Sequence, residues 1–192
     1  MTDIIYKPLK IHVGCGNRYL PGWVHVDLEK HREHVDHVCD IRYLDRVFGK
    51  DNVSEIYACH VIEHVGRHEI HDLFLSFFEL LEPGGVLRIA VPDIEKAIQL
   101  YVKGVPLWPT LYGQFWGGQK NEADYHYVGF DLKMLREMLT VVGFDRVDRY
   151  DWRDFLPEGF DDYSRSYLPH MDFEKGECLS LNVVAMKPIH IT

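Results

Sequence analysis

The sequence predicts an α/β fold built on a mostly parallel sheet. Short apolar segments alternate with turn or helix signals along the first half of the chain, and most of them end at a glycine, aspartate or proline. The clearest helical segment, residues 63–81, lies between two of these apolar segments. Strands that are separated by helices are typical of parallel sheets, because a parallel pair needs a crossover connection.

Five strands are expected in the first half of the chain and two near its end. Only residues 17–22 separate the turn after the first strand from the second strand, which is too short for a crossover helix. We therefore expect a shortened first crossover. The last two strands are expected to form the antiparallel edge that otherwise parallel sheets often carry. The seven expected strands cover residues 10–13, 23–27, 37–41, 54–61, 86–91, 145–152 and 179–186.

Two helices are indicated by apolar residues at helical spacing. The first is expected over residues 63–81, where the apolar positions form a single stripe, and Pro83-Gly84-Gly85 ends it. The second is expected to begin at Asp131, whose side chain suits a helix N-cap, and to end at Gly143. Both helices follow or precede apolar strands, as an α/β sheet requires.

Two long segments interrupt this alternation of strands and helices. Residues 104–130 are rich in aromatic side chains and glycine, and residues 153–177 are polar and aromatic without a clear period. Both exceed the usual length of a connection, so we expect functional loops or lids. The aromatic segment closes over a bound acceptor molecule, or it serves as a hydrophobic flap on the sheet edge or as a dimer contact, and the sequence leaves these alternatives open. No repeat or linker divides residues 1–192, which are expected to form one domain.

Composition and charge exclude several classes of protein. The formal net charge of −9 disfavours a nucleic-acid partner. No segment approaches the ~20 consecutive apolar residues that span a bilayer, and residues 1–10 lack the apolar stretch of a signal peptide, so a cytoplasmic protein without a membrane partner is expected. The four cysteines form no CxxC pair. At helical spacing His64, His68 and His71 lie on a solvated face, so no metal site is expected.

Three features at three successive strand ends point to an adenosine ligand. Gly14 and Gly16 let the backbone approach a ligand where a Cβ would collide. Asp27 ends the second strand and is placed to accept hydrogen bonds from both ribose hydroxyls. Asp40 ends the third strand and is placed to accept from an adenine amino group, with Ile41 beside the ring. Ligands of open α/β sheets lie across these carboxyl ends.

At these residues the sequence resembles the methyltransferase type 11 group of the class I S-adenosylmethionine-dependent methyltransferases. The matching segments are IHVGCG, VDL, CDI, ACHVIEHV, LLEPGGVLRIAVPD, LREMLTVVGF and LSLNVVAMKP, which cover most of residues 10–188. The resemblance implies a Rossmann-like seven-stranded sheet and S-adenosylmethionine as cofactor. The cofactor-binding residues that it implies are Gly14, Cys15, Gly16, Asp27, Leu28, Asp40, Ile41, Cys59 and His60.

The sequence departs from the family pattern at the first strand. The family carries an acidic residue two positions before the first glycine, where it helps to hold the amino end of the cofactor, but this chain has His12. A dinucleotide-binding dehydrogenase is the competing interpretation. The third glycine of its GxGxxG fingerprint is replaced here by Tyr19, and the helix that it would open is missing, which disfavours that class.

Methyl transfer requires alignment of the acceptor and a group that takes up its proton. His60 and Asp93 each follow a core strand, and His126 lies in the aromatic segment, where Asp124 could orient it. These three residues are the catalytic candidates. The resulting hypothesis is methyl transfer to a small-molecule acceptor, narrowed by the resemblance to a sugar or glycan precursor. A cofactor-binding scaffold without activity is the alternative, and the sequence does not indicate an oligomeric state.

Overall fold

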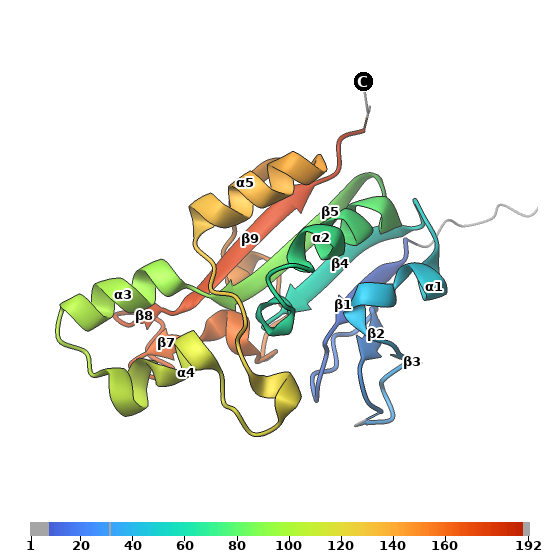
Figure 1. Ribbon diagram of the computed structural model, residues 1–192. Coiled ribbons are helices and arrows are strands. Elements are labelled where there is room, and N and C mark those ends of the chain that lie inside the picture. Colours follow the sequence, from blue (N-terminus) through green and yellow to red (C-terminus); the bar gives the residue numbers. More distant parts are fainter. Residues whose placement is uncertain (1–7, 31, 190–192) are drawn as a thin grey trace, which may run out of the picture.

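The computed structural model describes residues 8–30 and 32–189, which form a seven-stranded sheet flanked by helices (Figure 1). The strand order is β3-β2-β1-β4-β5-β9-β6. Five neighbouring strands, β3, β2, β1, β4 and β5, are parallel to one another. Strand β9 is antiparallel to both of its neighbours. The predicted fold class is therefore confirmed. The strands are β1 (Lys10–Val13), β2 (Val24–Asp27), β3 (His37–Val38), β4 (Val53–Cys59), β5 (Leu81–Pro92), β6 (Asp145–Arg149) and β9 (Ser180–Met186).

The position of the antiparallel strand differs from the prediction. The C-terminal strand β9 is antiparallel as expected, but it lies between β5 and β6 and is not at the edge of the sheet. The residues of β9 are mostly buried, whereas β6 exposes all but Val147. The apolar strand therefore takes the interior position with two partners, and the polar strand β6 forms the edge.

The first long helix is shorter than predicted. Helix α2 covers Ile70–Leu80, and residues 62–64 form a separate 3-10 turn, η2 (Ile62–His64). Gly66 lies in the turn between them. The second predicted helix is confirmed as α5 (Leu132–Val142), and the Asp131 carboxylate accepts a hydrogen bond from the Met134 N–H at 2.7 Å. The other helices are α1 (Asp45–Phe48), α3 (Ile94–Val102) and α4 (Tyr112–Trp116).

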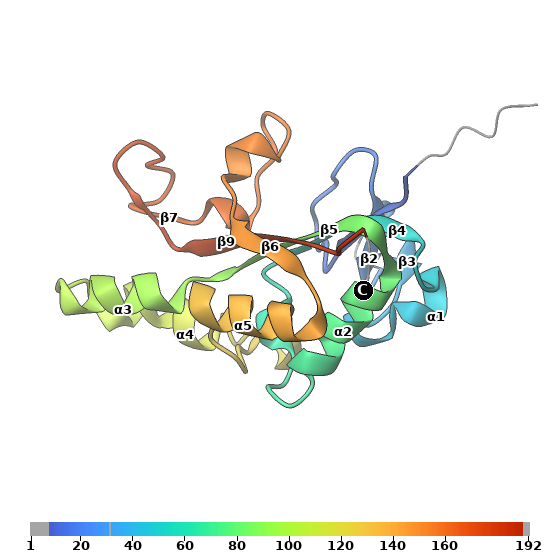
Figure 2. The same cartoon turned by 90° about the horizontal axis from the view of Figure 1, so that it is seen from above.

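One face of the sheet carries the main hydrophobic core. Successive residues of a strand point to opposite faces, and the residues that point to this face are aliphatic on every central strand. All five α-helices lie on this side of the sheet (Figure 2). Helix α2 contributes Phe74 and Phe77, both fully buried. One row of the core runs across the sheet through Val24, Ile11, Ile56, Leu87 and Ala185.

The opposite face is covered by loops instead of helices. The loop between β1 and β2 and the segment after β6 lie over it (Figure 2). That segment contains the two-stranded sheet of β7 (Tyr167–Leu168) and β8 (Glu177–Cys178). A second, smaller core beneath these loops is rich in aromatic side chains. Many of the strand residues that point to this face are polar or aromatic, and one row of them is His25, His12, Tyr57 and Arg88.

The predicted shortened crossover is confirmed, since the described residues between β1 and β2 contain turns and no helix. The segment 104–130 is more regular than the predicted loop. It holds η3 (Leu107–Leu111), α4 and η4 (Glu122–Asp124), whose residues pack through Leu111 and Phe115 into a third apolar cluster. Because most of its aromatic side chains remain half-buried or exposed, the segment had no apolar stripe from which its helices could be predicted.

No helix among residues 8–30 and 32–189 is long and apolar enough to cross a membrane. The expectation that residues 1–10 are not a signal peptide falls mainly on residues 1–7, which lie outside the described part of the chain.

Candidate functional site

A cavity of about 310 Å³ lies at the carboxyl ends of the central strands. Three parts of the chain form it: the turn after β1, the end of β4, and a short stretch of the segment that covers the loop face. Five of the predicted cofactor-binding residues line this cavity together, and the structure adds five others. The lining residues are His12, Gly14, Cys15, Gly16, Asn17, Arg18, Cys59, His60, Asp162 and Tyr163.

Gly14 and Gly16 are required for different reasons. Both have a positive φ, 63° and 53°, which glycine adopts without strain. A Cβ on Gly14 would lie 2.5 Å from a methyl of Val61, so this glycine permits close packing of the turn against the end of β4. A Cβ on Gly16 would meet no protein atom within 4 Å. The space beside Gly16 is therefore open to a ligand, as the glycine turn predicts.

Asp27 holds this turn from the end of β2. Its side chain is buried, and Oδ2 accepts a hydrogen bond from the Gly16 N–H at 2.7 Å. The contact places the carboxylate directly beside the open space at Gly16. Leu28, the next residue, is 52% exposed and faces away from the core. The end of β2 thus offers the carboxylate that the sequence predicts for a ribose, with an exposed apolar side chain next to it.

Asp40 and Ile41 are placed differently from this pair. Asp40 caps η1 (Ile41–Tyr43) and accepts hydrogen bonds from the Arg42 backbone N–H at 2.9 Å and from its guanidinium at 2.6 Å. The bond from Arg42 lowers the pKa of the Asp40 carboxyl despite its partial burial. Ile41 is part of the main core. The adenine contact of these two residues stays a prediction.

Asp162 is a site residue that the sequence does not reveal. It lines the cavity, and its Oδ2 accepts a hydrogen bond from the Tyr57 hydroxyl at 2.6 Å. Its Oδ1 accepts from the N–H and the hydroxyl of Ser164. Tyr57 in turn stacks on His12, with 5.2 Å between ring centroids. A carboxylate from the segment 153–177 therefore reaches the end of the cavity where the family has an acid on the first strand.

His12 itself is a buried neutral side chain. Burial, together with the nearby His25 and His34, lowers its pKa from 6.5 to about 3. A neutral imidazole at this position does not supply the negative charge that the acidic residue of the family carries there. The charge at this end of the cavity comes from Asp162, and no local pattern in residues 153–177 could have identified it, because the contact joins residues 105 positions apart.

The two cysteines of the cavity remain protonated. Burial, reinforced by the charge of Asp27, raises the pKa of the Cys15 thiol to about 12. Burial and the nearby Asp162 raise the pKa of the Cys59 thiol well above its usual value. A thiol is a nucleophile only as the thiolate, so neither cysteine is suited to nucleophilic catalysis. Both serve as small apolar lining.

His60 follows β4 in a left-handed conformation, with φ of 51°. This backbone turn directs its ring between two elements. Nε2 lies 3.1 Å from the Ser180 hydroxyl on β9, and Nδ1 lies 3.3 Å from Oε1 of Glu63. The ring also packs against Tyr163, with 5.4 Å between centroids. His60 is thus fixed at the wall of the cavity by neighbours on three sides.

A second cavity, of about 380 Å³, is lined by Ser180, whose hydroxyl contacts His60 of the first. Its lining is mainly charged and includes Lys96, Arg149 and Glu177. Asp93, a predicted catalytic residue, lies in this cavity. Its Oδ1 accepts a hydrogen bond from the Lys96 N–H at the start of α3, and its Oδ2 pairs with Arg149 at 3.1 Å. Both oxygens therefore have partners, and Asp93 lines a different cavity from His60.

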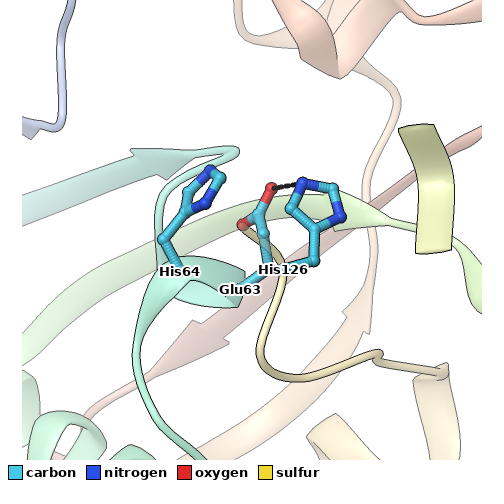
Figure 3. Close-up of side chains that lie close together, drawn as sticks. All are labelled: Glu63, His64 and His126. Atoms are coloured by element: carbon cyan, nitrogen blue, oxygen red, sulfur yellow. Dashed lines mark ion pairs between the residues drawn. The ribbon is translucent and has the colours of Figure 1, made fainter. Parts of the chain in front are cut away.

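His126 lies apart from both cavities. Its side chain points at the buried carboxylate of Glu63, with His64 on the other side of that carboxylate (Figure 3). Asp124 does not orient it, because Oδ2 of Asp124 accepts from the Lys120 N–H instead. The Gln114 carbonyl takes that place, 3.2 Å from Nδ1 of His126. Burial lowers the pKa of His126, although the nearby charge of Glu63 acts in the opposite direction.

Comparison with solved structures identifies the fold. A methyltransferase that depends on S-adenosylmethionine from Archaeoglobus fulgidus matches with a TM-score of 0.57 and 12% identity over 94% of this chain and 86% of that one. The 1,6-didemethyltoxoflavin N1-methyltransferase of Burkholderia thailandensis, solved with S-adenosylhomocysteine, matches with a TM-score of 0.54 and 16% identity over 95% of this chain and 72% of that one. No family model and no curated protein sequence matches the chain. The chain has the fold of class I S-adenosylmethionine-dependent methyltransferases.

Proposed function

We propose that this chain is an S-adenosylmethionine-dependent methyltransferase that acts on a small-molecule acceptor. The supporting observation is the cavity at the carboxyl ends of the strands, where open space beside Gly16 lies next to the Asp27 carboxylate. In open α/β sheets nucleosides bind at this position. The fold is shared with enzymes of this class, which supports the same assignment.

The cavity offers complementary groups for each part of the cofactor. Asp27 accepts from the ribose hydroxyls, and exposed Leu28 packs beside the base. At the other end, Asp162 faces the amino group of the methionine moiety, the role that an acid on the first strand has in the family. Arg18, which lines the same cavity, pairs with the carboxylate of that moiety. Charged groups of both signs thus meet both charges of the amino-acid end.

When bound, the cofactor supplies an electrophilic methyl group on its sulfonium. The chain must align the acceptor in line with it and exclude water. His60 is the residue placed to take up the acceptor proton, because it lines the first cavity and bonds to Ser180, which lines the second. Asp93 positions the start of α3 in this scheme.

The second cavity is the proposed acceptor site. Lys96, Arg149 and Glu177 give it charges of both signs, which suits an acceptor that carries hydroxyl and anionic groups. A sugar or glycan precursor has this chemistry and is the narrower proposal. The segments 104–130 and 153–177 contribute residues next to α3 and β9 and act as the lid that excludes water.

Titration calorimetry with S-adenosylhomocysteine tests the cofactor site. We expect binding to the wild type and binding about 10- to 100-fold weaker in Asp27→Ala, because one charge-assisted hydrogen bond to the ligand is lost and the turn is released. Asp145→Ala, which removes an exposed carboxylate of β6, is the matched control and should bind as the wild type does. Absence of heat with wild-type protein at about 1 mM ligand would refute the proposal.

A cofactor-binding scaffold without activity is the second candidate, and His12 in place of the family's acid is the observation that favours it. Cofactor binding does not separate the two candidates, but methyl transfer does. Assays of labelled methyl transfer to a panel of sugars and sugar phosphates should show turnover that His60→Ala lowers about 100-fold. Binding without turnover of any acceptor in the panel would favour the scaffold.

A further inference from the structure

Three potential metal ligands meet beside the main core, outside both cavities. The side chains of Glu63, His64 and His126 converge so that one ligand atom from each lies within 4.8 Å of the others (Figure 3). Glu63 and His64 belong to η2, after β4, whereas His126 comes from the segment 104–130. The sequence-based placement of His64 on a solvated helix face is wrong, because α2 begins only at Ile70.

The carboxylate of Glu63 is buried without the hydrogen bonds that an ionised group needs. Its side chain is fully inaccessible to solvent, and neither oxygen has a hydrogen-bond partner of good geometry among the described residues. His60 lies at ion-pair distance, with Nδ1 3.3 Å from Oε1, and His126 Nε2 lies 3.9 Å from the same oxygen. Buried carboxylates in proteins are paired or coordinate a metal, so this arrangement calls for a cation.

Both histidines of the cluster are fixed in the tautomer that coordinates metals through Nε2. His64 Nδ1 lies 2.9 Å from the Tyr125 carbonyl, and His126 Nδ1 lies 3.2 Å from the Gln114 carbonyl. A carbonyl only accepts, so each Nδ1 carries the proton and donates it. Each Nε2 is then left with a lone pair. A backbone carbonyl that orients the outer ring nitrogen is characteristic of metal-binding histidines.

We propose that Glu63, His64 and His126 bind a divalent transition-metal ion of the Zn²⁺ type. Two imidazoles and one carboxylate are a ligand set that zinc takes in sites with an open fourth position. The half-exposed ring of His64 provides the path of entry. The ion joins η2 to the segment 104–130 and so anchors that segment to the end of β4.

The distances are compatible with this ligand set once the side chains move closer to the ion. Zinc lies about 2.0 to 2.2 Å from nitrogen and oxygen ligands, so two ligands of a tetrahedral site are about 3.4 Å apart. The 3.9 Å between His126 Nε2 and Glu63 Oε1 needs to shorten by about 0.5 Å to reach that value, and any other pair of the cluster, all within 4.8 Å, by at most about 1.4 Å. Rotation of the half-buried His64 and His126 rings provides the movement, since both lie at the edge of the core.

Titration of metal-free protein with ZnCl₂ by calorimetry tests the site. We expect one ion per chain with micromolar or tighter affinity, and affinity lowered at least about 100-fold in His126→Ala and in Glu63→Gln. His71→Ala, which removes an exposed histidine of α2, is the matched control and should bind as the wild type does. Wild-type protein that binds no zinc, or binds it equally in His126→Ala, would overturn the proposal.

Two further measurements separate loss of the site from loss of the fold. Substitution with Co²⁺ should give the visible absorption of a low-coordinate nitrogen and oxygen site in wild type and in His71→Ala, and not in His126→Ala. Saturating zinc should raise the thermal midpoint of wild type by about 5 °C and leave that of His126→Ala unchanged, while far-ultraviolet circular dichroism shows both folded. These readouts do not depend on methyl transfer, so the test of the metal site is independent of the test of the proposed function.

Discussion

The two faces of the sheet are built from opposite kinds of residue. The helix face is apolar and packs against α1, α2 and α5, with fully buried side chains such as Phe77. The loop face carries His12, Tyr57 and Arg88 on its central strands and is covered by segments without long helices. Some of its buried polar groups form specific bonds, such as that from Tyr57 to Asp162, whereas the helix face is held mainly by apolar packing. The helix face therefore supports the fold, and the loop face supplies the chemistry of the cofactor cavity.

This division explains how a chain with a shortened first crossover retains a complete sheet. Aromatic side chains from the covering segments replace the missing helix, and Phe155 packs on Tyr57 with 4.9 Å between ring centroids. Arg88 lies over the face of Phe155 at 4.5 Å and pairs with Glu55. A charged pair beneath a loop is tolerated because its partners are fixed by the strands. Tyr57, on the same face of the sheet, holds Asp162 at the cavity.

The largest difference between the faces is expected in stability. Phe77→Ala should lower the free energy of unfolding by about 4 kcal/mol, because it empties a fully buried site among helices and sheet. Phe155→Ala on the loop face should lower it by about 2 kcal/mol, because that ring is only half-buried and the loop can collapse. Urea unfolding of both variants measures the two values. Equal losses of unfolding free energy in the two variants would contradict the view that the helix face contributes more to stability than the loop face.

A smaller effect is expected for the polar pair under the loop. The Tyr57 hydroxyl donates to Asp162, so Tyr57→Phe and Asp162→Asn should each destabilise the chain, with a coupling energy of about 2 kcal/mol in the double-mutant cycle. The bond is buried and involves a charged acceptor, which places it in the strong range. Urea unfolding of the four proteins in the cycle gives the coupling. Strictly additive losses would show that the two side chains act independently.

His12 makes the stability of the loop face depend on pH. Its pKa is about 3 in the folded chain and 6.5 when unfolded, so only the unfolded state takes up the proton just below pH 6.5. Stability is therefore full above that pH and falls as the pH drops toward 3. Between pH 7.5 and 5.5 His12 should account for a loss of about 1.4 kcal/mol.

Replacement by a neutral side chain isolates this contribution from other titrating groups. The variant His12→Gln keeps a polar side chain that does not titrate, while His25, whose pKa burial also lowers, remains in both proteins. The fall in unfolding free energy between pH 7.5 and 5.5 should be about 1.4 kcal/mol smaller in His12→Gln than in wild type. If the unfolding free energies of the two proteins changed equally with pH, His12 would not be a neutral histidine in the folded chain.

The sequence predicted what depends on local periodicity and missed what depends on long-range contacts. The turn at Gly14 and Gly16 and the cap at Asp131 follow from neighbouring residues and were found where expected. The strands were also found near their predicted positions, although β3 is shorter than predicted and β5 begins earlier, at Leu81. The position of β9 inside the sheet follows from pairing preferences between distant strands, which no local pattern contains. Asp162 and His126 reach their sites from long segments without a period, so only the folded chain shows their partners, Tyr57 and Glu63.

The smallest effect on the free energy of unfolding is expected for a surface ion pair that joins the helix layer to the segment over the loop face. Lys96 at the start of α3 pairs with Glu177 of β8 at 2.8 Å, and both side chains are partly exposed. An exposed ion pair contributes little because water and salt screen it, so Glu177→Gln should cost about 0.3 kcal/mol and less in high salt. Urea unfolding at two ionic strengths measures this value. The pair also borders the second cavity. A loss of unfolding free energy above about 1 kcal/mol in Glu177→Gln would contradict this expectation. It would show that this contact, rather than the aromatic core beneath the segment 153–177, holds that segment to the helix layer.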